Sequence, residues 1–109
     1  MDDRFVNAIL AEVSQEKAEA LGRAGNAVEG ALRELSNFDA HRDLWEPVRQ
    51  EQRRRLIWRI ARLLTNFIVQ REACGLFDPD YVFAFYKVPE EVIAQMGKRA
   101  AMLSNLPDR

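Results

Sequence analysis

The chain has few of the residues on which common catalytic and metal sites depend. Its 109 residues include one cysteine, Cys74, and one histidine, His41. A structural zinc site normally takes four cysteine or histidine ligands and a disulfide needs two cysteines, so one chain can build neither. Glycine-rich phosphate loops and nucleophile-elbow motifs are also absent from the sequence. We therefore expect no enzyme activity, no catalytic residue, no metal and no cofactor.

Turn-forming residues and long apolar runs are scarce as well. With 5 glycines and 4 prolines, the chain suits long helices better than a sheet with many tight turns. Its apolar runs are far shorter than the about 20 residues of a membrane helix. No basic region leads into an apolar signal core near residue 1, so we expect a cytoplasmic protein away from membranes. The length predicts one domain over residues 1–109.

What is present is a helical spacing of apolar residues. From Asp3 to Leu35 they recur at steps of three and four, which predicts an amphipathic helix. Gly25 could end one helix and Asn26 begin the next. The apolar stripe stays in phase across Gly25, so we favour one long helix that is kinked there at most. Residues 36–42 are expected to form a loop.

A second long helix is the clearest element of the sequence. Asp43 is a reasonable N-cap, and Pro47 fits the first helical turn. Near Cys74 the helix is expected to end, with Gly75 in the left-handed conformation that follows many helices. One continuous helix would hold His41 and Cys74 about 45 Å apart, too far for a nucleophilic pair.

Two shorter helices are predicted after residue 77. Asp78-Pro79-Asp80 is a typical helix start, followed by a helix over Tyr81–Lys87. Alternation of aromatic residues there also suits a strand, but no second strand-like segment could pair with it. Pro89-Glu90-Glu91 opens the last helix. The acids at both starts complement the helix dipole, which accounts for them without acid–base or metal chemistry. The apolar face of the last helix is Val92, Ile93, Met96, Ala100 and Leu103.

These elements predict an all-α fold: a long antiparallel helical hairpin with two short C-terminal helices, in a bundle completed by dimerisation. Both long helices are apolar over arcs wider than one neighbour covers, and wide apolar surfaces usually mark interfaces. The alternative is a monomer whose short helices cover Trp58. The candidate self-association interface is Trp45, Trp58, Val69, Ala20, Ala24 and Ala31.

Charge is unevenly distributed although the net charge is −1. Residues 1–40 hold 8 acidic and 4 basic side chains, whereas residues 41–75 hold 4 acidic and 8 basic. Arginine side chains suit phosphate, so the basic segment is a candidate polyanion ridge. The alternative is a helix face paired with the chain's own acids, and the negative net charge disfavours nucleic acid. The ridge consists of Arg53, Arg54, Arg55, Arg59 and Arg62.

An aromatic cluster follows the second helix. It could line a small apolar pocket or plug a small core. The candidate pocket residues are Phe77, Tyr81, Phe85 and Tyr86. Taken together, the sequence favours a non-enzymatic helical protein–protein interaction or structural module that forms a homodimer, with a further protein partner open. The alternative function is nucleic-acid binding through the arginine ridge, and a third is small-molecule sensing by the aromatic residues.

Overall fold

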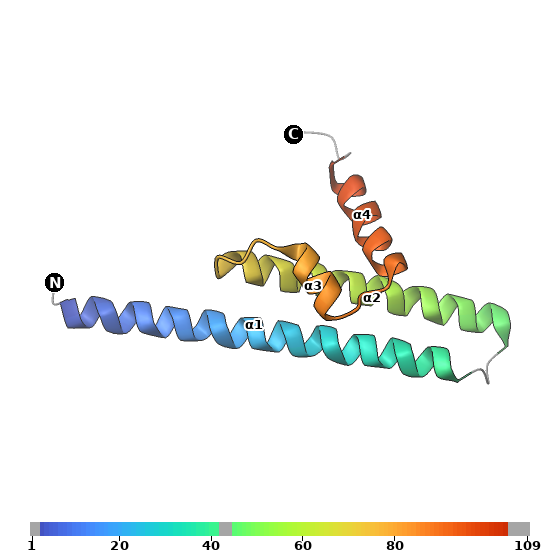
Figure 1. Ribbon diagram of the computed structural model, residues 1–109, viewed down its shortest axis with the longest axis horizontal. Coiled ribbons are helices and arrows are strands. Elements are labelled where there is room, and N and C mark those ends of the chain that lie inside the picture. Colours follow the sequence, from blue (N-terminus) through green and yellow to red (C-terminus); the bar gives the residue numbers. More distant parts are fainter. Residues whose placement is uncertain (1–2, 42–44, 105–109) are drawn as a thin grey trace.

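A computed structural model of the chain describes residues 3–41 and 45–104, with side chains up to residue 98. Within these residues the protein is all helical, in the order α1 (Asp3–Ala40), α2 (Glu46–Ala73), α3 (Pro79–Phe85) and α4 (Glu90–Ser104). Helices α1 and α2 form an antiparallel hairpin, α3 lies against it, and α4 projects from it (Figure 1). The predicted all-α class is confirmed, and the strand alternative for residues 81–87 is wrong.

Helix α1 runs without a break through Gly25, as favoured from the stripe. The loop predicted for residues 36–42 is wrong in most of its length, because α1 continues to Ala40. Phe38 is half-buried against the core and extends the apolar face by another turn. The buried guanidinium of Arg49 donates a hydrogen bond to the Phe38 carbonyl at 2.9 Å and another to the His41 carbonyl. These contacts stabilise a helix end that lacks its own basic residue.

Gly25 serves a close approach between helices. A Cβ atom at this position would lie 3.2 Å from Cε1 of Phe67 and 3.4 Å from the hydroxyl oxygen of Tyr86. The distance to Phe67 is shorter than most Cβ contacts, and the distance to Tyr86 is an ordinary van der Waals contact. The glycine therefore allows α2 and the end of α3 to pack directly on the α1 backbone.

The ends of α2 lie near the residues that the sequence predicts, as far as those residues are described. Pro47 lies in the first turn, as predicted, and the N-cap position is Trp45. The expected cap at Asp43 lies outside the described residues. At the other end Gly75 has φ = 84°, as predicted. The Gly75 N–H donates to the Glu72 carbonyl and the Leu76 N–H to the Arg71 carbonyl, the pattern of a Schellman motif.

Helices α3 and α4 also start near the predicted residues. Asp78 occupies the N-cap position of α3, but its carboxylate accepts a hydrogen bond from Arg71 at 2.8 Å in place of capping the helix. Helix α3 ends at Phe85, two residues before the predicted end, and Lys87 just beyond it has φ = 52°, a conformation that glycine adopts more easily. In α4, Val92 is buried as predicted. The predicted apolar residues Ala100 and Leu103 lie outside the described side chains.

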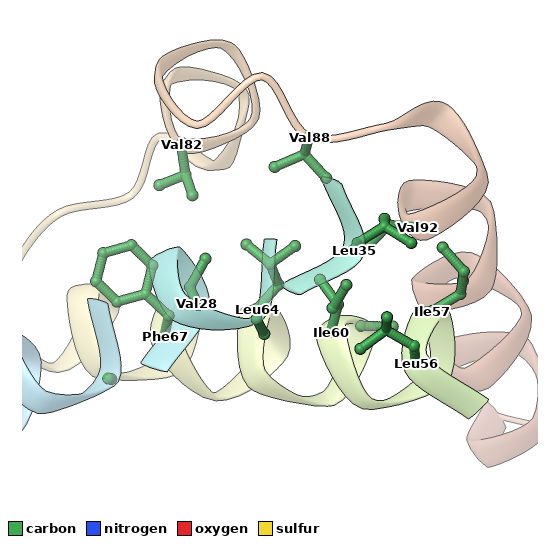
Figure 2. Close-up of a cluster of buried hydrophobic side chains, with 13 residues drawn as sticks. Val28, Leu35, Leu56, Ile57, Ile60, Leu64, Phe67, Val82, Val88 and Val92 are labelled. Atoms are coloured by element: carbon green, nitrogen blue, oxygen red, sulfur yellow. The ribbon is translucent and has the colours of Figure 1, made fainter. Parts of the chain in front are cut away.

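The core lies in the middle of the hairpin. Its α1 residues fall between positions 24 and 35, its α2 residues between 56 and 67, and the remaining three are Val82, Val88 and Val92. Figure 2 shows these three valines pointing toward the facing side chains of α1 and α2. The short C-terminal helices thus close one side of the hairpin. No residue before Ala24 belongs to this core in the described part of the chain.

Candidate interaction surfaces

The N-terminal half of α1 extends beyond the end of α2. Glu34 of α1 pairs with Arg59 of α2, and Gly25 lies against Phe67. Continued along the antiparallel hairpin, this register places Ala73, the last residue of α2, opposite about Glu19. Residues 3–18, called the overhang here, therefore continue past α2, as Figure 1 shows. At 1.5 Å per residue the overhang is about 24 Å long.

The overhang carries apolar side chains on its surface. Phe5, Ile9, Leu10 and Val13 are between 41% and 59% exposed, and Val6 is half-buried. They continue the face of α1 that packs on α2 farther along the chain. A helix of this length is marginal in water without packing of an apolar face. A contiguous exposed stripe of this kind usually marks a contact surface.

The outer face of α2 forms a second candidate surface. Trp58 and Val69 are 46% and 54% exposed, and the Arg62 guanidinium lies 4.9 Å from the centre of the Trp58 ring. The alternative in which the short helices cover Trp58 is therefore wrong for this chain. Trp45 is also exposed, at the start of α2. The three large residues predicted for self-association are thus all accessible.

The alanines of the predicted interface occupy different positions. Ala24 and Ala31 are buried in the chain's own core, where they face α2, and Ala20 is half-buried. Their small side chains allow the two helices of one hairpin to approach closely. Ala24 and Ala31 are therefore not accessible to a second protein, which corrects the predicted interface.

A groove of about 750 Å³ runs beside Trp58. Its volume lies within the range of small-molecule sites, but it is an open surface feature and not an enclosed cavity. Eight of its eleven lining residues are charged or polar. The apolar lining residues are Phe38, Leu56 and Trp58, and the charged ones are Glu34, Glu51, Arg54, Arg55, Arg59 and Arg62.

Acids of the same chain engage most of the arginine ridge. Arg54 and Arg55 both pair with Glu51, and Arg59 pairs with Glu34 of α1. The hydrogen bond from Arg54 has the largest effect and lowers the pKa of Glu51. Burial opposes it, and the hydrogen bond from Arg55 adds a smaller lowering effect. The arrangement matches the alternative in which the ridge is a charged helix face paired within the chain.

Arg53 lies apart from the other ridge residues and joins three helices. Its guanidinium donates hydrogen bonds to Asp39 of α1 at 2.8 Å and to Glu91 of α4 at 2.6 Å. The hydrogen bonds that Arg53 donates lower the pKa of Glu91, and the same bonds to Glu91 and Asp39 raise the pKa of Arg53. Its role is therefore to hold the start of α4 against the hairpin.

Three of the four predicted pocket residues come together. The rings of Tyr81 and Phe85 stack at 6.0 Å, and Phe85 meets Tyr86 edge to face at 5.0 Å. Tyr86 in turn packs on Phe67 of α2 at 5.8 Å and closes the core above Gly25. Phe77 is exposed and does not line this site. The space beside the rings is about 210 Å³, below the usual size of a ligand pocket.

Sequence reasoning missed two structural arginines, Arg49 and Arg71. Arg49 is 8% exposed, stacks on Phe38 at 4.5 Å and binds carbonyls at the end of α1. Arg71 lies between Phe67 and Tyr81, with its charge paired to Asp78. The signal available for Arg49 was its place in the first turn of α2, beside a helix end whose last carbonyls need donors.

His41 and Cys74 stay at opposite ends of the continuous helix α2, as predicted. The Nδ1 atom of His41 lies 2.7 Å from the Asn37 carbonyl oxygen, and Cys74 is exposed. In the part of the chain with described side chains, no three His, Cys, Asp or Glu residues gather in a way that could hold a metal ion. Among the described helices, none combines the length and apolarity needed to cross a membrane.

Comparisons of the chain with protein-family models, with curated proteins and with solved structures find no match in any of the three. The interpretation of its function therefore rests on the surfaces described above.

Proposed function

We propose that this chain is a non-enzymatic helical interaction module that self-associates as a homodimer. The observation that carries the proposal is the overhang, where an apolar face continues for about 24 Å past the helix that covers it elsewhere. Burial of Phe5, Ile9, Leu10 and Val13 against a second chain would remove this face from water. Trp58 and Val69, which the sequence predicts for the self-association interface, are exposed on α2 away from the overhang, and we assign them instead to contact with a further protein.

Nucleic-acid binding is the less well supported function. A phosphate-binding ridge needs arginines whose charge is available, whereas Arg53, Arg54, Arg55 and Arg59 each pair with an acid of the chain. Arg62 lies over the Trp58 ring. A ligand would have to displace these partners, and the net charge of −1 gives little attraction at long range.

The test is the solution mass of the purified chain, measured by light scattering or sedimentation over a wide concentration range. We expect a mass that rises toward twice the chain's 12.6 kDa as concentration increases. A mass of one chain at every concentration would contradict self-association. In the same samples, a fluorescent DNA or RNA duplex should show no binding at physiological ionic strength. Salt-sensitive binding that is lost on changing Arg55, Arg59 and Arg62 to Gln would favour the alternative.

A further inference from the structure

We infer that the overhang pairs with the overhang of a second copy, antiparallel and around a twofold axis near Ile9 and Leu10. The inference rests on the proposed self-association and specifies its surface. Within one chain α2 ends opposite about Glu19, so residues 3–18 have no helix of the hairpin beside them. A second overhang of the same length would cover them fully and would stop where the partner's own α2 ends.

The order of apolar residues along the overhang reads in the same way in both directions. With the axis between Ile9 and Leu10, Val6 of one copy lies opposite Val13 of the other, and Ile9 lies opposite Leu10. All four belong to the stripe on one side of α1, at helical steps of three and four. An antiparallel pair therefore brings apolar residue against apolar residue along the centre of the contact.

Charge complementarity favours the antiparallel direction. Asp3 and Lys17 lie on the same flank of the stripe, near opposite ends of the overhang. In an antiparallel pair equivalent flanks face each other, so Lys17 of one copy lies within one residue of Asp3 of the other, twice in the dimer. In a parallel pair opposite flanks face each other and Lys17 lies far along the helix from Asp3, so this ion pair would be lost. A parallel partner would also continue along the face of α1 that α2 already occupies. The antiparallel pairing also explains a lysine within an apolar stripe.

The far end of each overhang would meet further apolar surface. Leu76 and Phe77 follow directly after α2 ends and are 41% and 74% exposed. In the antiparallel arrangement the first residues of one copy arrive at this end of the partner's α2. Phe5, which is 58% exposed, then has apolar residues to contact.

Cysteine cross-linking tests the direction of the pairing. Exposed Cys74 is the sole cysteine, so Cys74→Ser gives a cysteine-free background. Val6→Cys and Val13→Cys are introduced separately, and the two proteins are mixed in equal amounts and oxidised. Random pairing would join position 6 to position 13 in half of all disulfides. We expect these mixed disulfides to make up more than half. Predominant 6–6 and 13–13 disulfides would overturn the antiparallel arrangement.

A matched pair of charged substitutions tests the surface. Leu10→Glu places two carboxylates beside the axis, and we expect the dimer dissociation constant to rise at least about tenfold, which corresponds to 1.4 kcal/mol. Val69→Glu makes the same kind of change on the exposed face of α2 and should leave the constant unchanged. Leu10 and Val69 both lie outside the core, so the two variants should have the same melting temperature in dilute solution. A dimer that survives Leu10→Glu but not Val69→Glu would overturn this surface while leaving self-association in place. A wild-type chain that is monomeric at all concentrations would contradict the proposed function itself.

Discussion

The two halves of α1 have the same kind of apolar spacing and different surroundings. From Ala24 to Leu35 the stripe is buried against α2, with Val28 fully covered. From Phe5 to Val13 it is exposed in the single chain. The difference lies beside the helix and not within it, because α2 is ten residues shorter than α1. An apolar stripe thus predicts that a helix has a neighbour along its length but not that the neighbour belongs to the same chain.

The largest contrast between the halves is expected from two leucine substitutions. Leu64 of α2 is fully buried opposite the packed half, so Leu64→Ala should lower the free energy of unfolding by about 3 kcal/mol through lost burial and a cavity. Leu10 lies in the overhang, and Leu10→Ala should change it by less than about 0.5 kcal/mol in dilute solution. Urea unfolding followed by circular dichroism measures both. A large cost for Leu10→Ala at the lowest protein concentration would mean that the overhang packs on its own chain.

Gly25 and Gly30 allow a similar comparison within the half of α1 that packs on α2. Gly30 is exposed with open space around its Cα, so Gly30→Ala should stabilise the protein by about 1 kcal/mol through helix propensity. Gly25→Ala gains the same propensity but pushes a methyl group against the Phe67 ring, which costs about 1–3 kcal/mol. We expect no gain from Gly25→Ala and a net loss of up to about 2 kcal/mol. Melting temperatures of the two variants, measured side by side, provide the check. A stabilising Gly25→Ala would show that the contact at Gly25 is looser than described.

Helix identity was predictable because its signals are local. The stripe, the Pro47 position and the Gly75 turn each depend on a few neighbouring residues, and the structure confirms them. The end of α1 was not predictable in this way. It depends on Arg49, nine residues after Ala40, whose guanidinium binds the carbonyls there. Residues 36–40 are therefore helical because of these tertiary contacts, although their composition suits a loop.

Surface residues were harder to assign than helices. The spacing of Ala24 and Ala31 predicts close approach of a helix, and that helix is α2 of the same chain. The arginines were visible as a ridge, but their partners Glu34, Asp39 and Glu91 lie on other helices. Sequence separation hides such pairs, whereas Glu51 could be proposed because it lies on the same helix.

The smallest predicted effect concerns the contribution of the Arg53–Glu91 ion pair to stability in acid. Arg53 lowers the folded-state pKa of Glu91 below its ordinary value of 4.5. A carboxyl with a lowered folded pKa stabilises the fold above its unfolded pKa and loses that contribution as the pH falls through the folded pKa. Because Glu91 is 47% exposed, solvent screening limits the contribution to at most about 1 kcal/mol. Glu91→Gln should therefore reduce stability slightly at pH 7 and flatten its decline below about pH 4.5.

Glu16→Gln in the overhang is the matched control, since Glu16 has no ion pair within the described residues. Urea unfolding at a series of pH values measures both variants in dilute solution. Equal flattening by the two substitutions would mean that the decline reflects overall charge and not the link that Arg53 makes between α1, α2 and α4.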